Sequence, residues 1–411
     1  MKMTSIKKIV TLSVVTSGLL VAGGYKIPEQ SLNSMALGAA YVAHTSGADT
    51  AYFNPAAMSF MADKQYVEGA ITLAHLPSNV YTLIDPYSGE SEVEDLLIPN
   101  AHYVANAIGD FRWGVSMVAP AGLTKRWETP YQKLYAEEFT LKIVEINPSV
   151  SYRVTDEFSI GGGLRLIYSE GVVNSDGSAA GAPIKREMKG DMIEFGYNLA
   201  MLYKPTSDIN LAVTYRSNID LKEEGQANLY FGGVGQQYDA AVTVPLPAAL
   251  NLAVSKTWNN TFTLEFNYER TYWSAYETLD FNYGRAIANP ILDGAFNTPL
   301  ARDWEDTNTF RIGATIAMDK VTMMMGFAID ETPVPSETIG FELPDSDAKI
   351  FSMGFRYQQT EELSWGAAFL YDSKEARSLT PGVAENQVLA NGGSFTEGGA
   401  FLTTIGMAYE F

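Results

Sequence analysis

The chain has 411 residues, enough for a large core, and its 48 acidic and 28 basic side chains give a formal net charge of −20. Binding a phosphate backbone requires a basic face, so this charge argues against a nucleic-acid partner. The absence of cysteine excludes disulfides, thiolate metal sites, thiol nucleophiles and a lipoprotein anchor. The many Tyr, Phe and Gly residues suit strands, interface girdles and tight bends better than a helical enzyme.

The first segment is typical of an export signal. Lys2, Lys7 and Lys8 form a basic start, Ile9–Val21 is apolar, and Ala22-Gly23-Gly24 offers small residues for cleavage. We predict a signal peptide over residues 1–23, cleaved near residues 22–24, with a retained anchor as the alternative. No later run of 18 apolar residues exists to form a spanning helix. The structure left for crossing a membrane is a closed β-barrel.

Alternation of apolar and polar residues supports this prediction. In Phe262–Glu269, for example, every second residue is aromatic or aliphatic and the intervening residues are polar. A period of two with one apolar side indicates a half-buried strand. Fourteen such segments follow the signal, and an even number is typical of a single-chain outer-membrane barrel. They span about 65–76, 99–108, 111–118, 137–153, 157–173, 187–203, 208–230, 239–256, 261–280, 303–318, 321–330, 347–358, 363–372 and 399–411.

The connections between these segments alternate between short and long. Gly109-Asp110 and Asp319-Lys320 are short, whereas Pro77–Ile98, Asn282–Arg302 and Ser373–Gly398 are long. Short periplasmic turns and long extracellular loops are expected of outer-membrane barrels, whereas a soluble sandwich or propeller does not need this alternation. We therefore predict an all-β protein, a 14-stranded antiparallel transmembrane β-barrel over residues 64–411.

Residues 24–63 do not share the strand pattern. Their stretch Ala48–Ser59 is apolar without a clean period of 2 or 3.6, and Asn54-Pro55 reads as a turn or capped break. A barrel of fourteen strands encloses more room than its own wall side chains fill. We therefore predict that residues 24–63 form an N-terminal hatch, or plug, inside the lumen.

Several ordered segments resemble one family. They are GGYKIPEQSLNSMALGAAYVA followed by the motif Asn54-Pro55-Ala56, then Ile146–Tyr168, Tyr203–Ser217, Leu246–Trp258, Tyr272–Phe281, Asp303–Ala314, Asp330–Pro335 and Leu343–Asp347. The mature chain is similar over essentially its whole length to the FadL/TodX family of outer-membrane transport proteins for long-chain fatty acids and hydrocarbons. The resemblance implies passive transport, a ligand pocket above the hatch, and a kinked strand that leaves a lateral opening in the wall. It places the kink in the third strand, where Gly114 and Pro120 can accommodate a break in pairing.

Candidate ligand contacts follow from position and residue type. Apolar residues of the first two long loops, among them Leu83, Trp127 and Tyr131, either bind ligand or pack the loops together. Phe53 and Met58 either line the pocket or pack the hatch against the wall. Asn54, with Pro55 and Ala56, is the candidate for holding the hatch closed, because its side chain can cap backbone groups. Arg165, Arg216, Arg311 and Arg356 face the lumen by parity, and Arg302 lies close to where the resemblance implies a basic pocket residue.

Two features depart from the family pattern. The loop Asn174–Arg186 is short and rich in Gly and Ala, so the outer groove and the ligand can differ, and Ala348-Lys349 stands where the resemblance implies an arginine. His44, His75 and His102 are isolated, and Asp345/Asp347 lacks a full calcium loop, so we expect no enzyme, metal or cofactor. We expect a monomer in contact with outer-membrane lipid and lipopolysaccharide. The alternatives are a porin-type channel for polar solutes and, from another class, an adhesin or barrel lipase.

Overall fold

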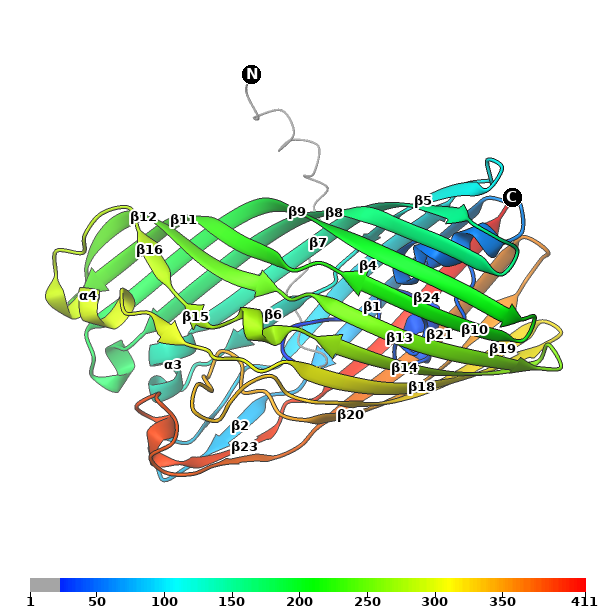
Figure 1. Cartoon of the computed structure of the whole chain (residues 1–411). Helices are drawn as coiled ribbons and strands as arrows, with labels where there is room; N and C mark the ends of the chain where they lie inside the picture. Colours follow the sequence, from blue (N-terminus) through cyan, green and yellow to red (C-terminus); the bar gives the residue numbers. More distant parts are fainter. Residues whose placement is uncertain (1–22) are drawn as a thin grey trace, which may run out of the picture.

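A computed structural model describes residues 23–411, so the signal peptide expected over residues 1–23 lies, apart from Gly23, outside the described residues. The wall of the molecule is a single antiparallel sheet of 18 strands in the described residues, closed because β1 pairs with both β4 and β24 (Figure 1). Four spans of the wall are each divided into two strands, so the sheet makes fourteen spans. The fourteen-stranded antiparallel barrel expected from the sequence is confirmed.

The bounds of the wall strands are β1 (Tyr66–Leu76), β4 (Glu94–Val104), β5 (Phe111–Val118) with β6 (Gly122–Arg126), β7 (Glu138–Arg153), β8 (Phe158–Asp176), β9 (Ile184–Thr206), β10 (Ile209–Arg216) with β11 (Ile219–Phe231), β12 (Val234–Leu246) with β13 (Ala249–Trp258), β14 (Phe262–Thr271) with β16 (Phe281–Tyr283), β18 (Thr307–Met318), β19 (Val321–Asp330), β20 (Ala348–Gln358), β21 (Leu363–Lys374) and β24 (Ala400–Glu410).

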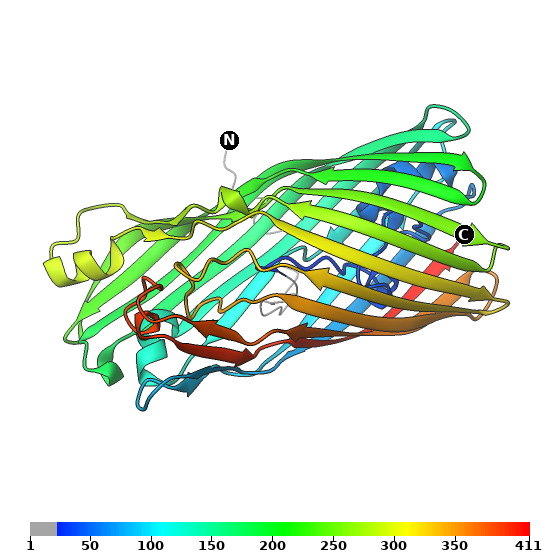
Figure 2. The ribbon, with the colours of Figure 1, turned by 60° about the horizontal axis from the view of Figure 1, so that its bottom comes forward.

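The long loops carry the remaining short elements, gathered at the end of the barrel opposite the C-terminus (Figures 1 and 2). These are β2 (Asn79–Thr82), β3 (Gly89–Glu90), α3 (Pro130–Ala136), a 3₁₀ turn at Ser178–Ala180, another at Trp273–Ala275, β15 (Thr278–Leu279), α4 (Pro290–Phe296), β17 (Leu300–Ala301), β22 (Arg377–Leu379), a 3₁₀ turn at Leu389–Asn391 and β23 (Gly393–Glu397).

Strand boundaries differ from the sequence expectation in several spans, among them the seventh, eighth and ninth. The ninth span, expected over 261–280, ends its regular pairing at Thr271, because Trp273 and Tyr276 turn inward and are buried. The seventh and eighth spans are both interrupted, at residues 217–218 and 247–248. Pro247 has no N–H to donate to a ladder, so its position at one interruption has a direct chemical cause.

The outer surface of the wall is apolar and the inner surface is polar. Along β9, Phe195 is 69% exposed, whereas Asn198, which faces the lumen, is 3% exposed. The same alternation recurs along β14, β18 and β20, as the period of two requires. Among the described residues, no helix is long and apolar enough to cross a membrane.

Residues 23–63 lie inside this barrel and are called the N-terminal segment here. They form α1 (Leu32–Ala36), α2 (Thr50–Phe53) and a 3₁₀ helix (Pro55–Phe60), drawn in dark blue within the wall in Figure 1. Three wall serines hold the segment by donating hydrogen bonds to backbone carbonyls: Ser352 to Ala36 at 2.9 Å, Ser149 to Ala51 at 2.9 Å, and Ser159 to Ala56 at 2.8 Å.

The backbone of the N-terminal segment approaches the wall closely at wall glycines. A Cβ atom added to Gly161 would lie 2.5 Å from the nitrogen of Ala56 and 2.7 Å from the carbonyl carbon of Pro55. A Cβ at Gly326 would collide with the backbone of Leu37. Both contacts are to backbone, which cannot rotate away as a side chain can. These glycines therefore permit the fit between segment and wall.

We predict that Gly161→Val displaces the Pro55–Phe60 turn from the wall while the barrel still closes, because β8 keeps its ladders with β7 and β9. Amide hydrogen exchange of residues 48–60 is expected to accelerate at least about tenfold, the effect of losing a packed contact worth more than 1 kcal/mol. Gly69→Ala is the control, because a Cβ there meets its nearest atom at an ordinary 3.5 Å. Unchanged exchange in Gly161→Val would contradict the close fit.

Candidate functional site

The wall is interrupted at residues 119–121, between β5 and β6, and the N-terminal segment covers this place. The Ile27 amide donates to the carbonyl of Pro120 at 2.9 Å, and the Gly122 amide donates to the carbonyl of Tyr25 at 2.9 Å. Lys26 is the residue that pairs with Ala121 in antiparallel register. The segment thus replaces a neighbouring wall strand over three residues.

A side chain completes the cover. Gln30 donates its amide to the carbonyl of Ala119 at 2.8 Å and accepts from the Ala119 amide at 2.9 Å. Both backbone groups of Ala119 are therefore paired with a residue of the lumen and not with the wall. Proline at position 120 has no N–H, so a ladder with β4 could not run through this position.

The strands on the two sides of the interruption part from one another. β4 pairs with β5 only through Ala101–Val104 opposite Gly114–Met117, and the recorded partner of β6 is β7. The edges meet again further along, where the Glu92 amide donates to the carbonyl of Arg126 at 2.8 Å.

Pro120 lies in the interruption itself, whereas Gly114 lies in the continuous part of β5, where an added Cβ would meet that of Ala51 at 2.7 Å. Their role in solute release stays a prediction.

A cavity lies between the N-terminal segment and the wall and is called the inner cavity here; its empty volume of about 760 Å³ includes space open to solvent. Its apolar lining includes Ile27, Val42, Phe53 and Pro55 from the segment and Leu246 from β12. Its charged lining consists of Lys26, Arg165, Arg216, Glu269 and Arg311. An apolar floor beside a charged side is the arrangement that an amphiphilic molecule requires.

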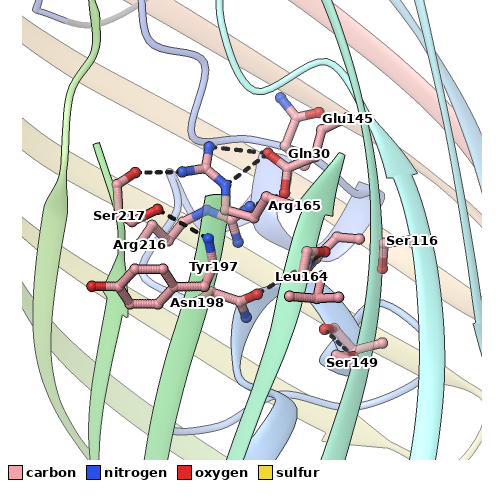
Figure 3. Close-up of polar contacts among 12 residues, drawn as sticks. Gln30, Ser116, Glu145, Ser149, Leu164, Arg165, Tyr197, Asn198, Arg216 and Ser217 are labelled. Atoms are coloured by element: carbon pink, nitrogen blue, oxygen red, sulfur yellow. Dashed lines mark hydrogen bonds and ion pairs between the residues drawn. The ribbon is translucent and has the colours of Figure 1, made fainter. Parts of the chain in front are cut away.

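The charges at the inner cavity form two networks. In the first, the Glu145 carboxylate accepts from Arg165 at 3.0 Å and from Arg216, and Arg165 also donates to the carbonyl of Ser217 at 2.7 Å (Figure 3). The Arg216 guanidinium lies over the Tyr52 ring, 4.2 Å from its centroid. Tyr52 belongs to the N-terminal segment, so this contact joins the segment to the charged wall.

In the second network, Glu269 pairs with Lys26 at 2.8 Å and with Arg311 at 3.2 Å. The two networks together hold four cationic side chains and two carboxylates, all buried or nearly so. The cavity side of these networks therefore has an excess of positive charge. In a region shielded from water, this excess favours a negatively charged group of a ligand.

The motif Asn54-Pro55-Ala56 lies in a connected part of the N-terminal segment. Asn54 donates its side-chain amide to the carbonyl of Val42 at 2.9 Å, and Pro55 begins the 3₁₀ helix. The same loop is held from the wall side, because the Glu265 carboxylate accepts from the amides of Val42, Ala43 and His44 at 2.6, 2.9 and 2.7 Å. Burial and nearby Lys204 lower the pKa of His44, so this loop carries no added positive charge at neutral pH.

A second, larger cavity lies among the long loops and is called the outer chamber here. Its empty volume is about 1520 Å³, part of it open to solvent. Phe139, Leu279, Phe281 and Phe296 supply much of its apolar lining. Arg186 also lines it and is stacked over Phe281, with 4.0 Å between its guanidinium carbon and the ring centroid. The outer chamber thus combines a broad apolar surface with two buried guanidinium groups, those of Arg186 and Arg302.

The residues expected at a ligand site fall into two groups. Phe53 lines the inner cavity, and Arg302 lines the outer chamber, where it pairs with Glu342 at 2.8 Å. Met58 is fully buried against the wall near Val104. Leu83, Trp127 and Tyr131 do not line either cavity: Trp127 donates its indole N–H to the carbonyl of Phe341 at 2.8 Å, Tyr131 packs on Tyr87, and Leu83 packs against the core of the loops.

Sequence reasoning missed three residues of these sites. Glu145 is the partner of two lumen arginines, and its parity with inward Asn147 and Ser149 on β7 could have identified it. Tyr25 carries no sequence signal of its position beside Trp273 and Trp304. For Arg186 the sequence predicts only the end of a loop, because the expected strand begins at residue 187, whereas β9 begins at Ile184.

Glu29 is the one acidic side chain of the described N-terminal segment whose two carboxylate oxygens are buried without a hydrogen bond from another residue. Burial raises its pKa to about 7, against the attraction of Arg311 and with smaller contributions from Asp372 and Asp330. The residue follows Pro28 and precedes Gln30, so a group with an unusual protonation equilibrium adjoins the cover of the wall interruption.

Residues 13–411 match the model of the family described as outer membrane protein transport protein (OMPP1/FadL/TodX). A long-chain fatty acid transport protein of Escherichia coli O6:H1 is 23% identical over 403 residues, with 86% of this chain and 88% of that protein covered. Outer membrane protein P1 of Haemophilus influenzae is 23% identical over 423 residues, with 87% and 88% covered.

Two solved structures share the fold. A Pseudomonas aeruginosa FadL homologue has a TM-score of 0.79 at 21% identity, and covers 94% of this chain and 99% of its own. The toluene transporter TodX of Pseudomonas putida has a TM-score of 0.70 at 14% identity, and covers 93% and 98%. At these identities the likeness extends to the fold alone.

We predict that Glu29→Gln tightens the N-terminal segment at pH 8 and has little effect at pH 4. A carboxyl group whose pKa is raised in the folded state binds its proton more tightly there, so stability falls as pH rises from the ordinary value of 4.5 towards 7. The glutamine avoids this loss, worth roughly 3 kcal/mol at most. Amide hydrogen exchange of residues 26–35 measures this difference in stability between wild type and Glu29→Gln. Substitution of an exposed residue, Glu361→Gln, is the control. Equal exchange of wild type and Glu29→Gln at pH 8 would contradict the assignment.

Proposed function

The chain belongs to the outer membrane protein transport protein family (OMPP1/FadL/TodX), and on that premise we propose that it transports long-chain fatty acids or other hydrophobic compounds passively through a hatch-gated barrel with lateral release. It is a multi-pass outer-membrane protein of bacteria, and its family is one of transport proteins, not of enzymes. The observation that carries the proposal is the wall interruption at 119–121, which residues 25–30 cover from inside.

The first step is capture at the outer chamber. A hydrophobic solute crosses the polar sugar layer of lipopolysaccharide poorly, so the protein must offer apolar surface beyond that layer. The lining of the chamber by Phe139, Phe281 and Phe296 supplies such surface. Each methylene group that leaves water contributes about 0.8 kcal/mol, so even part of a long chain is held without a tight pocket.

The second step is transfer to the inner cavity. The cavity places a solute against Phe53 and Pro55, residues of the same segment that covers the wall interruption. The excess of cationic groups around Arg165, Arg216 and Arg311 suits the carboxylate of a fatty acid, whereas the apolar floor suits any hydrocarbon. The similar proteins include both a fatty acid transport protein and a toluene transporter, and either class of cargo fits this lining.

The third step is release through the wall. Withdrawal of residues 25–30 would leave backbone groups of Ala119, Pro120 and Gly122 without their lumen partners and would open the gap beside β4. A solute leaving there enters the bilayer directly, without crossing the aqueous lumen or periplasm. The motif Asn54-Pro55-Ala56 and Glu265, which hold the 42–44 loop, are the candidates for restraining this movement.

The alternative, a porin-type channel for polar solutes, fits less well. The lumen holds the N-terminal segment, whose buried apolar residues Leu32, Met35 and Leu37 pack against wall residues. A water-filled pore requires the opposite, an open polar bore. An adhesin would not need two cavities and a covered gap in the wall.

We predict that loss of the protein from its host reduces uptake of labelled oleate, of toluene, or of both, and leaves sugar flux unchanged. Deletion of residues 24–63 is expected to raise leakage of small polar solutes, because the lumen loses its filling. Uptake assays on cells with and without the gene measure the first effect, and liposome swelling measures the second. A change in sugar or ion flux with no change in either hydrophobic compound would favour the porin reading.

A reversible lock tests lateral release directly. We predict that Lys26→Cys with Ala121→Cys forms a disulfide, because directly opposed residues of an antiparallel pair lie about 4.5–5.5 Å apart, within reach of the bond. The oxidised protein should lose most hydrophobic uptake and regain it on reduction, and the natural chain contains no cysteine to interfere.

The matched control for this lock is Thr72→Cys with Thr404→Cys, a directly opposed pair between β1 and β24 in the continuous wall. Its disulfide should leave uptake unaffected in both redox states. Full uptake by the oxidised Lys26/Ala121 pair would exclude movement of the cover as a step in transport.

A further inference from the structure

Two buried polar groups beside the outer chamber have no hydrogen-bond partner among the described residues. They are Nε of Arg186 and the hydroxyl of Ser175, and both residues line the chamber. Arg186 is 7% exposed and Ser175 is 2% exposed. Such groups are uncommon in folded proteins, because a buried donor without a partner has lost its hydrogen bonds to water and gained none. The two groups are therefore candidates for contact with a ligand.

The barrel wall brings these two groups together. Ser175 lies near the end of β8 and Arg186 near the start of β9, and the two residues are directly opposed in the antiparallel ladder. The Cα atoms of such an opposed pair lie about 4.5–5.5 Å apart. Because both side chains line the same chamber, they extend from the same face of the two strands. The paired groups are thus positioned by the wall itself and not by a connecting loop.

Aromatic rings surround the positive charge of Arg186. Its guanidinium carbon lies 4.0 Å from the centroid of the Phe281 ring and 5.2 Å from that of Phe296. The Tyr283 side chain is its polar neighbour. Stacking on rings orients a guanidinium and contributes a modest attraction, but it does not neutralise the charge.

The acidic residues of the chamber leave this charge without a counterion. Glu342 attracts Arg186 electrostatically, but it is already paired with Arg302 at 2.8 Å. Glu337 and Glu385 also line the chamber, but both are exposed, so water solvates them. Among the residues that the structure describes, no carboxylate forms an ion pair with Arg186. A buried cation without a counterion is costly, so this side of the chamber is suited to an anion from outside the protein.

The remainder of the lining suits a long apolar tail. Leu279, Phe281 and Phe296 line the chamber together with Arg186 and Ser175. A molecule held by a charged group at the two strands can therefore lay its hydrocarbon part on this surface and remove it from water. The chamber thus offers one polar anchor beside a broad apolar area.

We propose that Arg186 and Ser175 form an anion site in the outer chamber, which binds the carboxylate of a long-chain amphiphile. The Nε–H of Arg186 and the hydroxyl of Ser175 each donate to a carboxylate oxygen, and the tail lies on Phe281 and Phe296. The inference rests on the proposed function and narrows it, because such a chamber selects a carboxylate-bearing cargo over an uncharged hydrocarbon of the same length.

The number of donors favours a carboxylate over a phosphate group. One guanidinium and one hydroxyl match the single charge and two oxygens of a carboxylate. A phosphate monoester has three strongly accepting oxygens and carries a charge of about −1.5 to −2 at neutral pH, which these two groups do not satisfy. The site is therefore assigned to the head group of the cargo and not to a phosphate of lipopolysaccharide.

The first experiment compares oleate with oleyl alcohol, which has the same chain and no charge. Gln387 is exposed and lines the chamber, and the natural chain contains no cysteine, so Gln387→Cys carries a polarity-sensitive dye that reports binding in this chamber. With the labelled protein in lipid nanodiscs, we expect Arg186→Met to weaken oleate at least about tenfold. Oleyl alcohol should change less than about twofold, because methionine still packs on the Phe281 ring.

Two further variants make the test independent of a folding defect. Ser175→Ala removes only a hydroxyl and should weaken oleate at least about threefold. Arg285→Met is the matched control, because Arg285 is also stacked on a ring, 4.8 Å from the centroid of Tyr238, but is exposed and does not line the chamber. It should change both affinities less than about twofold.

Three outcomes would overturn the proposal. Equal weakening of oleate and oleyl alcohol in Arg186→Met would show that the arginine only packs the chamber. Unchanged oleate affinity in either Arg186→Met or Ser175→Ala would remove that residue from the site. Displacement of oleate by lipopolysaccharide added to the nanodiscs would assign the site to a phosphate group.

Failure of the proposed function gives a different result. Unchanged uptake of oleate and toluene in cells that lack the gene would leave a carboxylate-selective site in a protein that does not transport these compounds. Reduced uptake of both compounds, with equal oleate affinity in Arg186→Met and Arg285→Met, would confirm transport and exclude the anion site.

Discussion

The constraint on which this structure depends is the need to pair every backbone polar group within the membrane. Closure of the sheet between β1 and β24 removes its edges and meets that need around almost the whole wall. At residues 119–121 the wall leaves the pairing open, and Tyr25 and Ile27 supply the missing partners from inside. The interruption and its cover thus form one hydrogen-bonded unit, in which the N-terminal segment completes the wall.

This constraint also explains why the segment inside the barrel is built from helices of only four to six residues joined by irregular chain. Its carbonyls at residues 36, 51 and 56 accept hydrogen bonds from wall serines, and the amides of 42–44 donate to Glu265. A regular helix would have used these groups internally and would have nothing to offer the wall. The segment is therefore held by many single bonds around its circumference, an arrangement in which one side can detach while the others hold.

Much of the wall could be predicted from the sequence, because alternation with a period of two places each residue on one face. The inward position of Arg165, Arg311 and Arg356 follows from that parity alone, and the structure buries the first two and leaves the Arg356 side chain 15% exposed. Which acid each arginine meets does not follow, because the partner depends on the stagger between strands. Glu265 also lies on the lumen side, yet it accepts hydrogen bonds from backbone amides, whereas Glu145 pairs with Arg165 and Arg216.

The loops were less predictable for a related reason. Trp127 and Arg186 both lie near the mouth of the barrel, yet Trp127 is buried against Phe341, 214 positions away, and Arg186 lines the outer chamber. Nothing local to either residue distinguishes the two outcomes. The contacts that decide exposure come from loops that are distant in sequence, and a single chain carries no periodic signal of how such loops meet.

The shortness of Gly23–Ile27 couples two places that otherwise seem unrelated. An extended chain covers at most about 3.3–3.6 Å per residue, so four residue steps span no more than about 14 Å. One end is held at Asp330 and Asp345, and the other pairs with Pro120 across the lumen, with Tyr25 packed among aromatic rings between them. A segment as short as Gly23–Ile27 has little conformational freedom to absorb a displacement of either end. Release of the aspartate contacts would loosen the pairing at Pro120, and a solute that pushes on Ile27 from the inner cavity would in turn pull on the acidic end.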